Sequence, residues 1–288
     1  MQAVVFRKPN VVAVEEVPTP SVKPHEVLVR VEAAGVCGTD IHLMEGGYEP
    51  KYPLIPGHEF CGEVVEVGPG CSRIKVGDRV AVEPNVPCNN CPECLRGDHH
   101  YCRNMIVPGV NRPGGFGEYV VVLERGVFSV GDLDFAEGAL VEPLSCVLHA
   151  VEMLAPKMSD RALVMGAGPI GLMLGRVLKS RGIAQVDYLE RLDERRNYAA
   201  KEGVGEVFAS LGEVPEKHYE CVLDATGLGM LVSEAANRFV RARGKVLIFG
   251  VWNLLMTKIS TLLEPLDAWQ QKSPIEDFTG IPSNLVNA

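Results

Sequence analysis

The sequence lacks an excess of positive charge, and this lack limits the partners that the chain can have. Its 28 lysines and arginines are outnumbered by 37 aspartates and glutamates, which gives a formal net charge of −9. Nonspecific nucleic-acid binding draws most of its affinity from cations that neutralise phosphates. We therefore expect no nucleic-acid partner, and a small, neutral or mildly charged substrate fits the charge better.

The sequence also lacks the patterns of a signal peptide and of a membrane-spanning segment. At the start of the chain, Arg7 and Lys8 follow a short apolar run and Pro9 comes next, which is the wrong order for a signal peptide. The longest apolar run, residues 162–175, is broken by Gly and Pro and is shorter than the about 20 residues that span a bilayer. We expect a cytoplasmic protein without a membrane segment, whose nine cysteines favour metal binding over disulfides.

The secondary-structure pattern that the sequence predicts changes once along the chain. The sequence contains no internal repeat and no low-complexity tract. Short β-like runs punctuated by Gly and Pro occupy residues 26–32, 60–67, 79–83 and 119–123. Helical spacing follows over residues 135–154. Beyond Arg161, strands predicted at residues 162–165, 185–190, 221–224 and 245–249 alternate with helices predicted at 170–180, 193–201 and 230–240.

This change predicts an α/β chain with two domains. Residues 1–150 would form a β-rich, barrel-like domain, and residues 151–252 a doubly wound parallel sheet with helices on both faces. Residues 253–288 show neither a clear strand nor a strong amphipathic helix, and we expect them to form an atypical tail.

Four cysteines lie close together in one polar loop. The gaps between them are two, two and seven residues, and the members are Cys88, Cys91, Cys94 and Cys102. Four thiolates at about 2.3 Å each can close a tetrahedral zinc shell, which leaves no position open for chemistry. The pattern therefore indicates a structural zinc site, with an iron–sulfur cluster or four unrelated buried thiols as alternatives.

A second set of residues has the mixed chemistry of an open metal site. A catalytic zinc needs about three protein ligands of S, N and O type and a free position for substrate. The candidates are Cys37, His58, Glu59 and Glu142. Each has an ordinary alternative: Cys37 as a core thiol, His58 and Glu59 as polar residues after a turn, and Glu142 as a cap before a proline.

A glycine-rich turn stands between a predicted strand and a predicted helix. Gly166, Gly168 and Gly171 give the spacing that lets a backbone approach a pyrophosphate at a helix N-terminus, with Pro169 and Ile170 between them. Glu190, about 20 residues on, ends the next strand where it can bind a ribose 2′-hydroxyl.

This spacing predicts a dinucleotide site, in which Glu190 favours NAD over NADP. The adjacent Arg191 could instead accept a 2′-phosphate, and Glu190 could be merely a solvated strand end. Thr226 follows a later strand at the expected cofactor edge.

Together these motifs resemble the zinc-containing medium-chain alcohol dehydrogenases, within them the sorbitol, arabinitol and threonine dehydrogenase branch. The resemblance covers about residues 1–252 and rests on the four-cysteine loop and on the segments 37–42, 57–60, 114–119 and 142–145. It implies a GroES-like first domain, a Rossmann second domain, about two zinc ions per chain and a nicotinamide cofactor.

The resemblance also assigns roles. It implies that Cys37 and His58 bind the catalytic zinc, that Glu59 and Glu142 complete its shell directly or through water, that Thr39 binds the reacting hydroxyl and that His42 passes its proton outward. The activity that it implies is oxidation of a secondary alcohol of a polyol-like small molecule to a ketone. Alternatives are a threonine dehydrogenase-like activity, or a noncatalytic zinc-binding remnant of the family.

The resemblance ends near Gly250, whereas the family usually continues and completes the nucleotide-binding sheet. From this break we expect an incomplete Rossmann sheet with exposed edges. The strand that commonly builds the family's dimer would be missing, so that a homo-oligomer is compatible with the sequence but not predicted by it.

Overall fold

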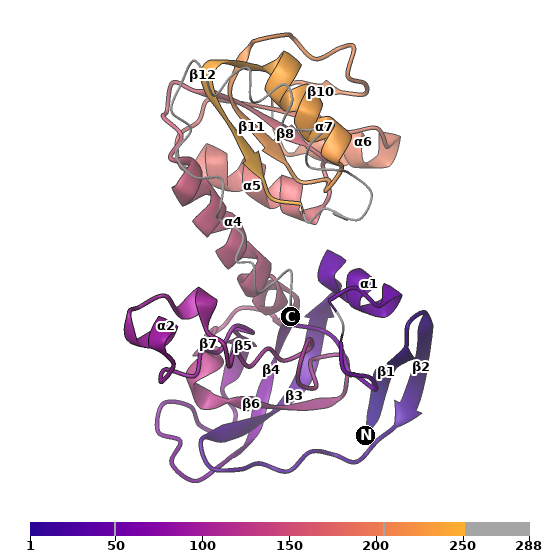
Figure 1. Cartoon of the computed structure of the whole chain (residues 1–288), viewed down its shortest axis with the longest axis vertical. Helices are drawn as coiled ribbons and strands as arrows, with labels where there is room; N and C mark the ends of the chain where they lie inside the picture. Colours follow the sequence, from indigo (N-terminus) through magenta and orange to yellow (C-terminus); the bar gives the residue numbers. More distant parts are fainter. Residues whose placement is uncertain (49, 204, 251–288) are drawn as a thin grey trace. The chain divides into compact units, whose positions relative to one another are not determined.

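The computed structural model describes residues 1–250 except 49 and 204. These residues divide into two compact units, one from Met1 to Glu142 and one that begins at Pro143 (Figure 1). The predicted tail, residues 253–288, lies outside the described residues. Within the described part, no helix has the length and apolar character needed to cross a membrane.

The first unit is built on a five-stranded antiparallel sheet with the strand order β6-β3-β4-β5-β7, and it also holds a two-stranded hairpin, β1–β2. This confirms the β-rich fold predicted for this part. The strands are β1 (Gln2–Lys8), β2 (Val11–Glu16), β3 (Glu26–Gly35), β4 (Glu59–Val67), β5 (Arg79–Val82), β6 (Tyr119–Leu123) and β7 (Val127–Ser129). The helices are α1 (Gly38–Glu45), α2 (Pro92–Leu95) and α3 (Phe135–Ala139), with 3₁₀ turns at His99–Tyr101 and Glu124–Gly126.

The core of this sheet follows from alternation along the strands. Val27 and Val29 of β3, Phe60 and Val64 of β4 and Val80 of β5 are all buried in one apolar cluster. Since successive side chains of a strand point to opposite faces, every second residue of these strands reaches the same core. Burial of that face fixes the pairing of β3 with β4, on which the candidate site depends.

The second unit is a parallel sheet of five strands with the order β10-β9-β8-β11-β12. The first crossovers run outward from β8 to β10, and the chain then returns to the other side of β8, which is the doubly wound topology predicted. The strands are β8 (Arg161–Met165), β9 (Gln185–Leu189), β10 (Val207–Phe208), β11 (Tyr219–Asp224) and β12 (Val240–Ile248). The helices are α4 (Val141–Leu154), which begins in the last residues of the first unit, α5 (Pro169–Ser180), α6 (Asp193–Lys201) and α7 (Gly229–Glu234).

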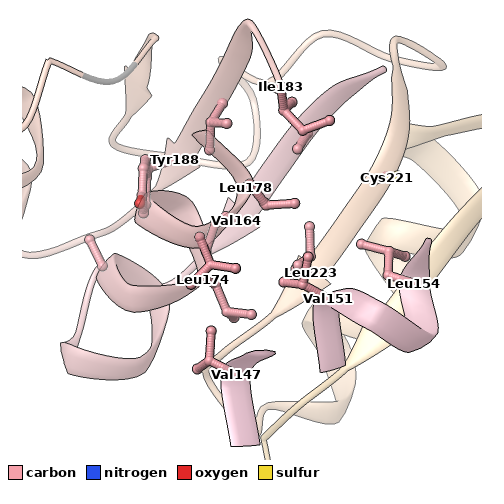
Figure 2. Packing of buried hydrophobic residues seen from close by; sticks show 14 of the residues in the cluster. Val147, Val151, Leu154, Val164, Leu174, Leu178, Ile183, Tyr188, Cys221 and Leu223 are labelled. Carbon is pink, nitrogen blue, oxygen red and sulfur yellow. The ribbon is translucent and has the colours of Figure 1, made fainter. Parts of the chain in front are cut away.

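Helices cover both faces of this sheet. Figure 2 shows one face, where Val151 of α4 and Leu174 and Leu178 of α5 pack with Val164 of β8 and Leu223 of β11. On the other face, Leu163 and Met165 of β8 join a second buried cluster that includes Phe239. Alternate residues of β8 thus pack into the cores on opposite faces of the sheet, which explains why the sequence of this strand is apolar after its first residue.

Several element ends differ from those predicted by a few residues, and strands β1, β2, β7 and β10 were not among the predicted ones. Two boundaries differ for a reason that the structure shows. The helical run over residues 135–154 is divided into α3 and α4 around Leu140. The strand predicted from residue 245 begins at Val240, because β12 pairs first with Tyr219, then shifts register, and pairs again from Lys245 opposite Cys221. The residues between form an irregularity that contains Arg243 with a φ of 64°. A π-helical turn, Ala235–Phe239, connects α7 to this strand.

We predict that Leu174→Ala destabilises the second unit, because the side chain is completely buried between α5 and the sheet. A cavity at such a site costs about 2–5 kcal/mol. The matched control is Leu192→Ala, whose side chain is 45% exposed. Urea unfolding followed by circular dichroism should show a lower midpoint for Leu174→Ala alone, and equal midpoints would contradict the packing shown in Figure 2.

Candidate functional site

The pairing of β3 with β4 brings the open-site candidates together. In this antiparallel ladder Gly35, the last residue of β3, lies opposite Glu59, the first residue of β4. Cys37 follows β3 by two residues and His58 directly precedes β4. Gly35 leaves room for the glutamate, since a Cβ there would lie 2.5 Å from Glu59 Oε2. Residues some 20 positions apart in sequence therefore meet at one end of the ladder.

Cys37, His58 and Glu59 form a compact group of potential metal ligands. Their ligand atoms all lie within 4.8 Å of one another. His58 is buried, with 8% of its surface exposed. One sulfur, one imidazole and one carboxylate at this separation match the mixed ligand set of a zinc site that keeps a position open.

Asp40 ties the two ligand-bearing segments to each other. Its carboxylate accepts a hydrogen bond from Cys37 N at 2.8 Å and another from Gly57 N at 3.1 Å. The same carboxylate lies 3.7 Å from His58 Nδ1, a buried atom without a hydrogen-bond partner. A ring nitrogen that faces a carboxylate is typical of histidines that ligate metals, because the carboxylate orients the ring.

The electrostatics of this group suit a cation. Burial lowers the pKa of His58, but the neighbouring Asp40 and Cys37 outweigh burial and raise this pKa to about 10. Burial also raises the pKa of Glu59. The acidic groups beside His58 would equally stabilise a bound cation. The donor set itself, one thiol, one imidazole and one carboxylate with ligand atoms within 4.8 Å of one another, fits a zinc ion.

The other open-site candidates are placed differently. Thr39 and His42 both lie on α1, half-buried and one helical turn apart. The ring of His42 is edge-on to that of Tyr48, with centroids 6.0 Å apart. Glu142 lies half-buried in the first turn of α4 and is not part of the compact group of three. Its contribution to a metal shell stays a prediction.

The four-cysteine loop forms a second compact group. The sulfurs of Cys88, Cys91, Cys94 and Cys102 all lie within 4.8 Å of one another, without a disulfide between them. The separation is 3.4 Å between the sulfurs of Cys91 and Cys94 and 4.0 Å between those of Cys88 and Cys94. A tetrahedral zinc–thiolate shell places sulfurs about 3.8 Å apart. The loop therefore fits a closed zinc site.

Local structure prepares this loop for thiolates. Cys91 caps the short helix α2 and Cys94 lies within that helix, while the bridge between Val86 and Ile106 closes the base of the loop. A hydrogen bond from the backbone of Asn90 contributes most to lowering the pKa of Cys88, to about 6. Burial, with neighbouring Cys91 next, raises the pKa of Cys94 to about 12. Thiolates in such contact repel one another, and a metal ion would relieve this repulsion.

The glycine-rich turn joins β8 to α5 closely. Gly166 has a φ of +95°, which favours glycine, and Gly168 precedes Pro169, the first residue of α5. A Cβ on Gly171 would lie 1.9 Å from Gly166 O, so that only glycine permits this approach of helix and strand. Ile170 follows in the first turn of the helix and packs against the core. The turn leaves the N-terminus of α5 free of any side-chain cap, as a phosphate site requires.

Glu190 is held firmly beside this turn. It is 6% exposed, and its two carboxylate oxygens accept hydrogen bonds from Ala167 N and Leu192 N, both at 2.9 Å. Arg195 Nη1 lies 4.0 Å from Glu190 Oε2 and is also the nearest atom to a Cβ placed on Gly168, at 3.6 Å. Arg191 is exposed on the loop that follows. Acidic and cationic groups thus both face the turn.

Thr226 lies at the carboxyl end of β11, next to the same turn. Its hydroxyl donates to Asp224 Oδ1 at 2.6 Å and accepts from Leu228 N at 3.1 Å. A Cβ on Gly166 would lie 2.9 Å from Thr226 Cγ2. The structure therefore brings Thr226 to the glycine-rich turn, at the point where the strand order reverses and where ligands bind in such sheets.

Two residues of these sites were missed by the sequence analysis. Asp40 reads in sequence as an acidic residue in the first turn of a short helix, and only its position three residues after Cys37 signals a capping interaction. Arg195 lies in a run of charged residues that is typical of a solvated helix face, so no sequence signal distinguishes it from its neighbours.

Comparison with known proteins places the chain among dehydrogenases. Residues 23–132 match the alcohol dehydrogenase GroES-like domain. The chain is 34% identical over 265 residues to D-arabinitol dehydrogenase 1 of Uromyces fabae, a match that covers 88% of this chain and 76% of the relative. It is 32% identical over 288 residues to an L-threonine 3-dehydrogenase of Rhizobium rhizogenes, which covers 91% of this chain and 82% of the relative.

Solved structures agree in fold. A zinc-binding dehydrogenase from Sinorhizobium meliloti, bound to NADP, superimposes with a TM-score of 0.85 at 31% identity, covering 94% of this chain and 82% of that one. An alcohol dehydrogenase from Escherichia coli complexed with NADH has a TM-score of 0.76 at 30% identity, covering 93% of this chain and 81% of that one. Both a cofactor with a 2′-phosphate, NADP, and one without it, NADH, thus occur in solved structures of similar chains.

We predict that the purified, desalted protein carries about two zinc ions per chain, one for each compact ligand group. Cys37→Ser should reduce the content to about one, and Cys88→Ser should remove the other ion. Cys71→Ser is the matched control, because Cys71 belongs to neither group. Elemental analysis measures the content; a full complement in Cys37→Ser would exclude the open group as a zinc site.

Proposed function

This chain belongs to the zinc-containing medium-chain alcohol dehydrogenase family, and we propose that it oxidises a secondary hydroxyl of a polyol-like substrate to a ketone, with hydride transfer to NAD. The observation that carries the proposal is the convergence of Cys37, His58 and Glu59 on one small volume. The named relatives are dehydrogenases, which favours an enzyme over a noncatalytic zinc-binding remnant.

In this proposal the first unit holds the metal and the reacting hydroxyl. Cys37, His58 and Glu59 bind zinc, with Glu142 as a further ligand directly or through water, and Asp40 fixes the orientation of His58. Zinc, when bound, supplies a Lewis acid that lowers the pKa of an alcohol. The four-cysteine loop takes a second zinc ion that has a structural role.

Thr39 and His42 carry the proton in the proposed reaction. Thr39 lies on α1 two residues after the ligand Cys37, and its hydroxyl would accept a hydrogen bond from the substrate hydroxyl and give up its own proton as it takes that of the substrate. His42 lies one turn further along the same helix and is half-buried, which suits a group that passes a proton to solvent.

The second unit binds the cofactor. The pyrophosphate would lie over Gly166 to Gly171 at the N-terminus of α5, with Thr226 lining the nicotinamide half. Glu190 would accept hydrogen bonds from the adenosine ribose and repel a 2′-phosphate. Arg191 and Arg195 act in the opposite direction, because their guanidinium groups attract phosphate. We give the greater weight to Glu190, since two backbone N–H groups hold its carboxylate beside the turn.

A second candidate substrate is a β-hydroxy amino acid such as L-threonine. It is favoured by the threonine dehydrogenase relative, which matches 91% of this chain. The arabinitol dehydrogenase relative supports the polyol. The two candidates share the metal and cofactor chemistry and differ only in the groups that surround the reacting carbon.

We predict that arabinitol, sorbitol and related polyols reduce NAD with a higher kcat/KM than L-threonine. Cys37→Ser should lower kcat/KM by about 10³-fold, because metal stabilisation of a developing alkoxide is worth several kcal/mol. Cys71→Ser should retain activity. Absorbance of NADH at 340 nm follows the reaction. A preference for threonine would replace the polyol, and no turnover of any alcohol by fully zinc-loaded protein would refute the proposed function.

For the cofactor, we predict a preference of the native protein for NAD over NADP, which Glu190→Gln reduces by about tenfold, the equivalent of about 1.4 kcal/mol. The substitution keeps the size of the side chain and removes its charge. Glu194→Gln is the matched control, since Glu194 is exposed on α6. Ratios of kcat/KM for the two cofactors test this, and an NADP preference in the native protein would assign the dominant role to Arg191 and Arg195.

A further inference from the structure

The segment Gly114–Gly115–Phe116 lies along the turn that leads to His58. Three backbone hydrogen bonds join them: Gly114 N donates to Ile55 O at 2.8 Å, Phe116 N to Pro56 O at 2.9 Å and Gly115 N to Gly57 O at 2.7 Å. The three acceptors are consecutive residues, so the segment is hydrogen-bonded to each of the three residues that directly precede His58. None of these three hydrogen bonds involves a proposed metal ligand.

The packing between segment and turn leaves no room for a side chain on the glycines that meet there. A Cβ on Gly114 would lie 2.2 Å from Gly57 O, and a Cβ on Gly57 would lie 2.3 Å from Cδ1 of the Phe116 ring. Gly114, Gly115 and Gly57 are all buried. Since a Cβ closer than 3.0 Å forces something to shift, neither Gly114 nor Gly57 could carry a side chain without displacing its neighbour.

The position of the Gly57 carbonyl sets the position of His58. This carbonyl belongs to the peptide unit that also contains His58 N, and a peptide unit is planar. A displacement of the oxygen therefore rotates the bond that leads into His58. Because Gly57 N donates to Asp40 on the other side, the turn is fixed from two directions, by Asp40 and by the segment.

The segment is itself anchored outside the turn. Phe116 O accepts a hydrogen bond from Val4 N of β1 at 2.8 Å, and Gly117 pairs with Ala3. The ring of Phe116 is thereby held against Gly57 by a neighbouring strand.

We propose that residues 114–116 position the metal ligand His58, so that they determine the affinity and the geometry of the Cys37–His58–Glu59 centre. Phe116 and Gly114 are positioning residues, which act through the Gly57 peptide. The inference rests on the proposed function, because it requires a metal at this centre.

Cobalt tests the proposal, since Co²⁺ replaces zinc and gives visible bands that report ligand geometry. The bands of the open centre are those lost in Cys37→Ser, and the bands of the four-cysteine loop are those lost in Cys88→Ser. The informative variant is Gly114→Ala, whose new methyl group must displace Gly57 O. The control is Gly117→Ala in the same segment, where the nearest atoms to a Cβ are Ala3 Cβ and Met1 Cε, both at 3.3 Å.

We expect Gly114→Ala to shift the open-centre bands and to weaken Co²⁺ binding there by about 10–100-fold, as when a supporting residue of a metal ligand is lost. The bands of the four-cysteine loop should not change, and Gly117→Ala should match the native protein. A contribution to folding alone would lower stability without shifting the bands of one centre.

Phe116→Leu decides the matter if Gly114→Ala does not fold, because it removes the ring from Gly57 without adding atoms near the turn. We expect the same selective shift, and Phe116→Tyr should restore the native bands. Native bands and affinity in every folded variant would overturn the positioning role while leaving the proposed function intact. Absence of open-centre bands in the native protein would instead overturn the metal centre, and with it both proposals.

Discussion

The register between β3 and β4 determines both the core of the first unit and its candidate metal centre. Val29 lies opposite Val64 in this ladder, and Gly35 lies opposite Glu59. A slip of one residue would turn the apolar side chains of one strand out of the core. It would also turn Glu59 away from Cys37. The free energy of burying valines therefore maintains the alignment of the ligands, although none of the valines touches them.

The two ligand groups depend on the fold to different degrees. All four cysteines of the closed group come from one loop, whose base is fixed by the pairing of Val86 with Ile106. The open group needs two segments to be aligned by a sheet and tied by the buried carboxylate of Asp40. A site of the first kind can form wherever its loop forms, whereas the second kind requires the surrounding sheet.

The same difference decides what can be predicted from sequence. The spacing of the four cysteines and the spacing of the glycines are local, so the four-cysteine loop and the glycine-rich turn could be located without a structure. Most strands and helices of the second unit were predicted from apolar periodicity. Asp40 could not be recognised, because an acidic residue in a first helical turn is ordinary and its second partner, Gly57 N, is distant in sequence. The register shift in β12 was missed for a similar reason, since it depends on pairing with β11.

In the sheet of the second unit, ion pairs and the glycine-rich turn lie at opposite ends of the strands. At its amino edge, Glu220 accepts hydrogen bonds from Arg161 and pairs with Arg241 at 2.8 Å. Burial would raise the pKa of Glu220, but Arg161 outweighs burial and holds it at about 2. These ion pairs join β8, β11 and β12, and the parallel pairing then continues from Ala162 opposite Cys221 to Met165 opposite Asp224. Because the strands stay in register, Gly166 and Thr226 lie side by side at the carboxyl edge, where ligands bind in sheets of this topology.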